Sequence, residues 1–242
     1  MIDIKNLTIN YDKKVIDNIS FVTEPGKVHV LMGRNGAGKS SILNAISGLV
    51  NYDGDIKTDG KISYLNQNIN TKVNFTVFET IILGKVKSLN FKVSKEDIKD
   101  TFEIMDLLDL RQFENKKINK MSGGEVQKVL IAQALISKPD ILLLDEPVSA
   151  LDLHNQYEIL AIIKKLTKDL NLTTLITLHQ MELIERYADN IILINDKKIY
   201  AKGDKYTIFT EKMFDEVYNI DAKINKVDNN LLFLFNINSN LG

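Results

Sequence analysis

Apolar residues recur along the chain with periods that predict alternating strands and helices. Alternating positions over residues 2–9 and an apolar run over 15–22, joined by a polar turn, predict a β-hairpin. Continuous apolar runs at 27–32, 140–144 and 173–178 predict strands that are buried on both faces, as in a parallel sheet. Helical spacing follows the first two of these runs. The pattern therefore predicts an α/β fold with a mostly parallel sheet.

Further patterns complete the expected layout. A second hairpin is predicted over residues 55–65, around an Asp-Gly turn. Capping boxes at 76–79 and 94–97 open amphipathic runs and predict helices inserted into the fold. A later pair of strands is predicted at 190–194 and 198–201. The tail carries aromatic residues at roughly helical spacing that are expected to pack on the core: Tyr206, Phe209, Phe214 and Tyr218.

A glycine-rich loop follows the strand at 27–32 and matches the phosphate-loop pattern G-x-x-x-x-G-K-[ST]. Its glycines permit backbone angles that let successive N–H groups wrap phosphate oxygens. Lys39 is expected to reach the β and γ phosphates, and the hydroxyl of Ser40 is the expected Mg²⁺ ligand. A helix with apolar positions from Ile42 to Leu49 is expected to follow. The expected contacts of a nucleoside triphosphate here are Gly33, Asn35, Gly36, Ala37, Gly38, Lys39, Ser40 and Ser41.

Two carboxylates, Asp145 and Glu146, end the apolar run at 140–144. Asp145 is placed to hold Mg²⁺ through water, and Glu146 to orient or deprotonate a water that attacks the γ phosphate. An acidic pair before proline is also a common strand-end turn. The catalytic interpretation therefore depends on the phosphate loop upstream.

Ser122, Gly123, Gly124 and Glu125 stand at the start of another predicted helix. Ser122 and Glu125 form a capping box, so one interpretation is a well-made helix start. The two glycines leave backbone N–H groups open, and a helix N-terminus of this kind binds phosphate. Because one chain already has a loop at 33–41 for its own nucleotide, this second site would belong to the nucleotide of another subunit.

The amino-acid composition limits which kinds of molecule and which compartment we expect for this protein. Lysine and arginine number 31 and aspartate and glutamate 32, so the net charge of −1 gives no general attraction to nucleic acid, which is not expected as a partner. The absence of cysteine excludes disulfides and thiolate metal sites and suits a reducing cytoplasm. The amino end lacks the apolar core of a signal peptide, and the apolar runs are too short to cross a bilayer. If the protein acts at a membrane, we expect it to do so without entering the lipid bilayer.

The order of these motifs resembles the nucleotide-binding subunit of ATP-binding cassette (ABC) transporters over about residues 1–203. The resemblance implies a P-loop NTPase core with a mostly parallel sheet, an N-terminal antiparallel β subdomain and an inserted α-helical subdomain. The chain would then be a single ABC ATPase domain over 1–242. Its expected parts are a nucleotide-binding core with the β subdomain at 1–75 and 138–203, a helical subdomain at 76–137 and a C-terminal extension at 204–242.

The resemblance also implies roles for single residues. Tyr11, at the tip of the first hairpin, fits an ordinary turn as well as base stacking, and the resemblance favours stacking on adenine. The implied catalytic residues are Lys39, Gln67, Glu146 and the switch histidine His179, with Gln67 also linking the site to a transmembrane partner. ATP would further contact the signature at Ser122, Gly123, Gly124 and Glu125 and the D-loop at Asp152. Mg²⁺ would be held by Ser40, Gln67 and Asp145.

In this family two cassettes pair head to tail, so the signature of one subunit completes the ATP site of the other. That arrangement accounts for the second phosphate site predicted at 122–125. Four positions depart from the family pattern. Met121 keeps an apolar anchor and Glu125 keeps its capping role, whereas Val148 and Gln180 replace the more frequent threonine or serine and aspartate.

Three stretches, at 76–84, 151–156 and 187–193, are similar to importers of chelated iron, haem and cobalamin. The expected protein is an ATP-hydrolysing subunit, with ATP and Mg²⁺, on the cytoplasmic face of the cell membrane. Its expected partners are a second copy of itself, integral membrane permease subunits and, indirectly, a substrate-binding protein.

Other functions remain open. A subunit of an importer or exporter for another substrate has the same motifs. Soluble ABC ATPases of cluster assembly, repair or translation commonly carry paired cassettes or long coiled insertions, and this chain has one cassette and no long heptad run. Residues 225–228 match the guanine-reading pattern N-K-x-D, but no D-x-x-G motif occurs, and we interpret the match as a coincidence.

Overall fold

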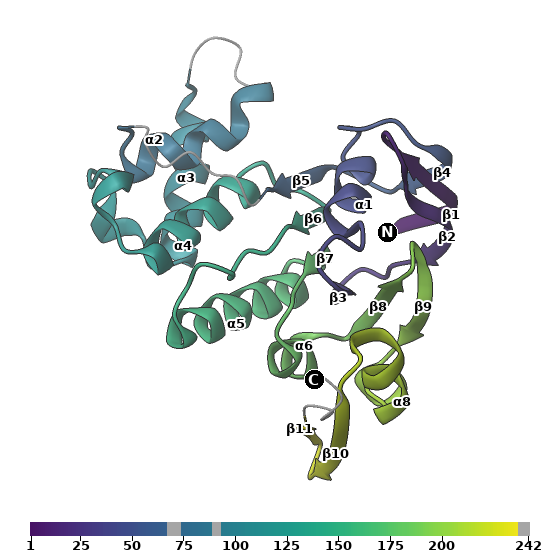
Figure 1. Ribbon diagram of the computed structural model, residues 1–242. Coiled ribbons are helices and arrows are strands. Elements are labelled where there is room, and N and C mark those ends of the chain that lie inside the picture. The colour runs from purple at the N-terminus through teal and green to yellow at the C-terminus, as the bar shows by residue number, and fades with distance from the viewer. Residues whose placement is uncertain (67–73, 89–92, 237–242) are drawn as a thin grey trace.

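The computed structural model describes residues 1–66, 74–88 and 93–236 (Figure 1). At its centre is a six-stranded sheet in which all neighbours are parallel except the last pair. In spatial order its strands are β5 (Ile62–Leu65), β6 (Ile141–Leu144), β7 (Thr173–Thr177), β3 (Lys27–Met32), β8 (Asn190–Asn195) and β9 (Lys198–Gly203).

The four inner strands of this sheet separate two hydrophobic cores. Alternate side chains of β6 enter opposite cores: Leu142 and Leu144 belong to one, and Ile141 and Leu143 to the other. This double burial is the reason that the runs at 140–144 and 173–178 read as continuous rather than alternating. The prediction of a mostly parallel sheet is confirmed.

A second, antiparallel sheet packs at the amino end. Its strands, in the order β2-β1-β4, are β2 (Lys14–Val22), β1 (Ile2–Asn10) and β4 (Asp53–Thr58). The first predicted hairpin, β1 with β2, is confirmed.

The second predicted hairpin is wrong. β4 pairs with β1, whereas β5 joins β6 in the other sheet. The Asp-Gly turn is present, with Gly60 at φ 100°. It lies where the chain passes from β4 in the antiparallel sheet to β5 in the central sheet. The N–H of Asp59 donates to the Met1 carbonyl, and the N–H of Lys61 donates to the Asp140 carboxylate. A turn signal therefore indicated a change of direction without specifying which edge each strand would meet.

Helices cover the central sheet and form an insert beside it. α1 (Lys39–Ile46) follows β3, and α5 (Leu153–Asp169) and α6 (Met181–Tyr187) follow β6 and β7. The insert contains α2 (Val77–Ile82), α3 (Lys95–Leu107) and α4 (Gly123–Leu135), with short 3₁₀ turns at Leu83–Ser88, Arg111–Phe113 and Ile118–Lys120. All three predicted capping boxes form, at the starts of α2, α3 and α4. Figure 1 shows the insert and the antiparallel sheet on opposite sides of the central sheet.

The expected fold class, an α/β core with a mostly parallel sheet, an antiparallel amino-terminal sheet and inserted helices, is confirmed. One local detail differs: α1 ends at Ile46, so Leu49 does not continue its apolar face and is 64% exposed. Within the described residues, none of the helices is long and apolar enough to span a membrane.

The tail contains a hairpin that sequence reasoning missed. After α7 (Lys205–Ile208), α8 (Glu211–Met213) and a π-helical turn (Phe214–Tyr218) come β10 (Asp221–Val227) and β11 (Asn230–Asn236). The signal was present, because two runs of equal length flank the two-residue turn Asp228-Asn229. The N-K-x-D match lies on β10 and this turn.

Aromatic residues attach the tail to the core as expected, with one exception. Phe209 and Phe214 are buried, whereas Tyr206 is 42% exposed. Burial raises the pKa of Tyr218 to about 12, against the opposing charge of Arg34 in the phosphate loop.

We expect Phe214→Ala to lower the free energy of unfolding by about 3–5 kcal/mol, because it leaves a cavity in a closed core. Phe235→Ala, on the 45% exposed ring of β11, is the matched control and should cost clearly less. Urea unfolding measures both. Equal losses in the two variants would contradict the packing described here.

Candidate nucleotide-binding site

A cavity of about 450 Å³ lies where the central strands end. It brings together the phosphate loop, Glu146 and His179, which are far apart in the sequence. The order β6-β7-β3 explains this convergence, because parallel neighbours end at the same edge of a sheet. The lining residues are Val15, Asn35, Gly36, Gly38, Lys39, Ser40, Ser41, Glu146 and His179.

At two positions of the loop only glycine fits, because neighbouring atoms leave no room for a side chain. A Cβ on Gly33 would lie 2.5 Å from the Ile194 carbonyl oxygen, and one on Gly38 would lie 2.7 Å from Ile16 Cδ1. Both residues also have positive φ, 152° and 96°. Gly33 and Ala37 do not line the cavity, whereas Gly38, the N-cap of α1, does.

Lys39 provides the positive charge of the cavity. Its Nζ donates to the carbonyl oxygens of Gly33 and Arg34 at 2.9 and 3.0 Å, and the residue is 6% exposed. Burial lowers the pKa of Lys39, while the negative charges of Glu146 and Asp145 act in the opposite direction. A buried cation beside open backbone N–H groups is a site for a polyanion.

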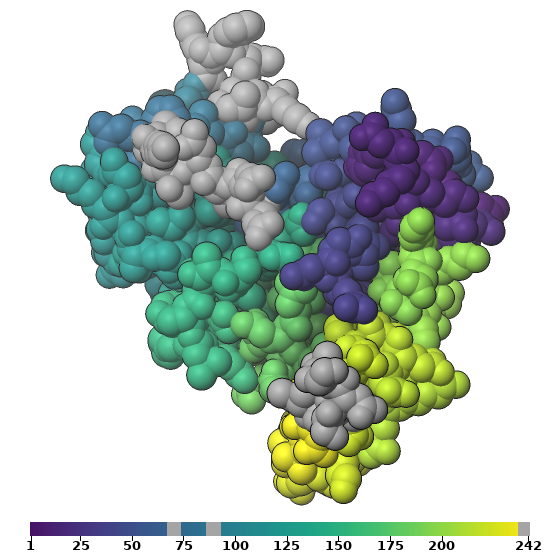
Figure 2. All heavy atoms as spheres, in the orientation of Figure 1, coloured from purple at the N-terminus to yellow at the C-terminus, as the bar shows by residue number. Residues whose placement is uncertain are grey.

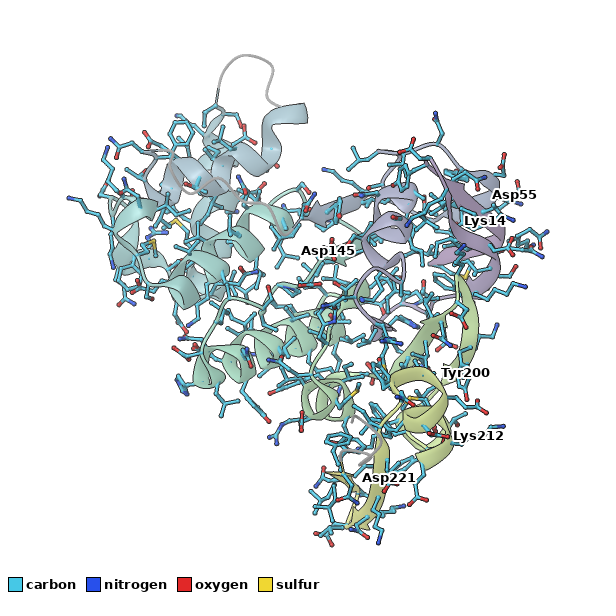
Figure 3. The ribbon with its side chains drawn as sticks, in the orientation of Figure 1. Lys14, Asp55, Asp145, Tyr200, Lys212 and Asp221 are labelled. Carbon is cyan, nitrogen blue, oxygen red and sulfur yellow. The ribbon has the colours of Figure 1, made fainter. Side chains whose placement is uncertain are left out.

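Asp145 and Glu146 follow β6 but are held differently. Asp145 is buried, and its Oδ1 accepts a hydrogen bond from Thr177 Oγ1 at 2.8 Å. Figure 3 labels Asp145 in the middle of the molecule, at the end of β6. Glu146 lines the cavity, and its Oε1 forms a hydrogen bond with Nε2 of His179. Burial raises the pKa of Tyr64, and the nearby charge of Asp145 raises it further.

Two features of this region were not predicted. Val15 lines the cavity from the start of β2, and nothing in the local pattern marked it out. Thr177 contacts both Asp145 and Glu146. The available signal for Thr177 was a hydroxyl residue at the end of a predicted buried strand, two positions before His179.

The signature residues lie outside the cavity, at the N-terminus of α4. The N–H of Ser122 donates to Glu125 Oε2 at 2.9 Å, and this bond lowers the pKa of Glu125, as does Lys116. A Cβ on Gly124 would lie 2.2 Å from Asn155 Oδ1, so this glycine lets α4 approach α5. Asp152 caps α5 by accepting the N–H of Asn155 at 2.9 Å, which lowers the pKa of Asp152.

Two other predicted residues are not in the cavity. Tyr11 is 53% exposed and lines a separate hollow with Asn10 and residues 48–51. Gln67 lies outside the described residues. Gln180, which replaces the frequent aspartate, donates to Gln156, whose own amide donates to the carbonyls of Val148 and Leu151. The substitution thus ties the His179 segment to the D-loop.

The residues at hand fit Mg²⁺ bound together with phosphate. Mg²⁺ is commonly held through one or two carboxylates plus substrate phosphates rather than by an all-protein cage. Ser40 lines the cavity, and the charge of Asp145 acts on Lys39. Within the described ranges no group of three or more His, Cys, Asp or Glu residues forms a metal site of its own.

Comparisons with known proteins agree with this geometry. The family described as ABC transporter matches residues 16–149, more than half of the chain. An ABC transporter ATP-binding protein of Methanocaldococcus jannaschii is 35% identical to this chain, and the alignment covers 89% of each protein. A probable iron chelatin transport ATP-binding protein of Helicobacter pylori is 30% identical over 96% of this chain and 98% of its own length.

Solved structures share the fold. A metal-chelate type ABC transporter in an inward-facing conformation superposes with a TM-score of 0.89 at 24% identity, over 99% of this chain and 98% of the other. A dimeric ATP-binding cassette bound to ADP and Pi superposes with a TM-score of 0.73 at 27% identity, over 84% and 98%. Sequence, fold and cavity therefore lead to one conclusion: the chain belongs to the ABC transporter family and is an ATP-binding cassette ATPase.

Proposed function

We propose that this ATPase powers a membrane importer for a metal chelate such as an iron chelate. The observation that carries the catalytic part is the single cavity that gathers Lys39, Glu146 and His179. The substrate class is supported by the Helicobacter pylori relative and by the metal-chelate type transporter with the same fold. Haem and cobalamin, also expected from the sequence, belong to the same broad class of metal chelates.

In the proposed mechanism the γ phosphate of ATP lies against the phosphate loop and Lys39. Glu146 orients the attacking water and accepts its proton, and the Glu146–His179 hydrogen bond places the imidazole beside the same phosphate. Ser40 and Asp145 would hold Mg²⁺, which neutralises charge on the phosphates. Lys39 and the loop N–H groups face the charge that develops in the transition state.

A second copy of the chain completes each site. Ser122 and Gly123 are exposed and lie outside the cavity of their own chain. A head-to-tail dimer brings the N-terminus of α4 of one subunit to the γ phosphate held by the other. Asp152 and Tyr11 are then expected to contact nucleotide at the interface and at the base. The dimeric cassette with the same fold supports this arrangement.

A permease subunit is proposed to dock in a groove of about 720 Å³ between α1, β5 and the end of α2. The groove is lined by Leu49 and Leu83, which are 64% and 37% exposed, and by Tyr64 of β5. In the sequence β5 is followed closely by Gln67, to which the family resemblance assigns the link between the permease and the nucleotide site. Figure 2 shows the helical insert and the antiparallel sheet on opposite sides of the molecule. The protein would then work on the cytoplasmic face of the membrane, with a substrate-binding protein reached only through the permease.

We expect Glu146→Gln to bind ATP and to accumulate as a closed dimer with turnover reduced by about 10²–10³-fold, because the group that positions water is lost. Phosphate release measures turnover, and light scattering with and without ATP measures the dimer. Normal hydrolysis by this variant would contradict the role given to Glu146.

We expect Leu83→Asp to weaken copurification with the permease while the ATP turnover of the isolated subunit stays unchanged, because it replaces an exposed apolar side chain of the groove by a charged one and Leu83 does not line the nucleotide cavity. Leu232→Asp, on the 51% exposed Leu232 of the tail hairpin, is the matched control and should leave copurification intact. Equal recovery of the permease with both variants would place the docking surface elsewhere.

A further inference from the structure

Thr177 is a buried threonine at the end of β7 that touches both acidic residues of the site. Its hydroxyl donates to Asp145 Oδ1 at 2.8 Å and accepts the backbone N–H of Glu146 at 2.7 Å. The exposed fraction of Thr177 is 0%. One hydroxyl therefore uses its donor on one acidic residue and its acceptor on the next.

The register of the sheet explains why the Thr177 side chain, and not a backbone carbonyl, accepts the N–H of Glu146. β6 and β7 pair as far as Leu144 and Ile176, and the chain of β6 then leaves the ladder. A backbone N–H that leaves a ladder inside the protein needs another acceptor, since an unpaired buried donor is costly. The Thr177 hydroxyl is that acceptor for Glu146.

Glu146 needs this support because its backbone is strained. Its φ of 49° lies in the left-handed region, which residues other than glycine seldom adopt. Ser149 holds the other side of the residue: its N–H and its hydroxyl both donate to the Glu146 carbonyl, at 3.3 and 3.2 Å. Thr177 and Ser149 thus fix the backbone from which the Glu146 side chain reaches His179.

We propose that Thr177 is a positioning residue for ATP hydrolysis, whose hydroxyl fixes the Asp145 carboxylate relative to the Glu146 backbone. The inference rests on the roles proposed above for Asp145 and Glu146. Thr177 does not line the nucleotide cavity, so it acts through these two neighbours and not on ATP. The hydroxyl carries the effect, and the methyl group only packs.

Thr177→Val keeps the shape of the side chain and removes the hydroxyl. A lost hydrogen bond to a charged group corresponds to about a ten- to hundredfold drop in kcat, and the KM for ATP should stay unchanged because the phosphate loop is intact. Steady-state turnover of the full chain at saturating Mg²⁺ measures both constants. Thr177→Ser, which keeps the hydroxyl, should retain most of the wild-type kcat.

Thr174→Val is the matched control. Thr174 lies on the same strand, is also 0% exposed, and shares a 2.6 Å hydrogen bond with Thr167. Both valine variants should therefore lower the unfolding midpoint, but only Thr177→Val should lower kcat. A wild-type kcat in Thr177→Val, or an equal loss in Thr174→Val, overturns the proposal.

A second pair keeps the test decisive if Thr177→Val does not fold. Thr177→Ala and Thr177→Ser both lose the methyl group and differ only in the hydroxyl, so a kcat that is equally low in both overturns the proposal. Glu146→Gln in the same assay separates the two claims. Normal turnover by Glu146→Gln refutes the role of Glu146, whereas the alanine–serine comparison still decides whether turnover depends on the Thr177 hydroxyl.

Discussion

The site depends on three neighbouring parallel strands that end at one edge of the sheet. β3 delivers the phosphate loop, β6 the acidic pair and β7 His179, and their order β6-β7-β3 leaves no other element between them. Each strand is buried on both faces, so a slip in register would move a whole set of apolar side chains out of its core. The cores that stabilise the fold therefore also set the distances between the residues that line the cavity.

The same strand ends show why part of the structure could be predicted. The phosphate loop at 33–41 carries its own conformational signature, and buried runs fix strands and capping residues fix helix starts through local chemistry. Pairing is not local: the turn at Gly60 was recognised, yet its two strands joined different sheets. The tail hairpin was missed because its turn, Asp228-Asn229, lacks the glycine that marks most two-residue hairpin turns. Thr177 was not predicted because its hydrogen bond to the Glu146 N–H depends on the point at which β6 stops pairing with β7.

The distribution of the remaining site residues favours a shared site. The helix start at Ser122 is well capped within its own chain and closely packed on α5 through Gly124 and Asn155. It is therefore a rigid feature, and its residues lie outside the cavity that Lys39 lines. If the helix start at Ser122 binds phosphate as proposed, a head-to-tail pair needs no rearrangement within either chain, because the rigid-body approach of two copies brings it to the phosphate loop. Hydrolysis, which removes the shared γ phosphate, would release the two halves.

Mixing two defective variants tests the shared site most directly. Lys39→Ala removes the cation of the phosphate loop, and Ser122→Arg places a large side chain in the signature. Each variant alone should therefore form homodimers without ATP turnover. A mixed dimer pairs the intact loop of the Ser122→Arg subunit with the intact signature of the Lys39→Ala subunit, and the mixture should regain ATPase activity. Inactivity of the mixture, or normal turnover by Ser122→Arg alone, would contradict a site built from two copies of the chain.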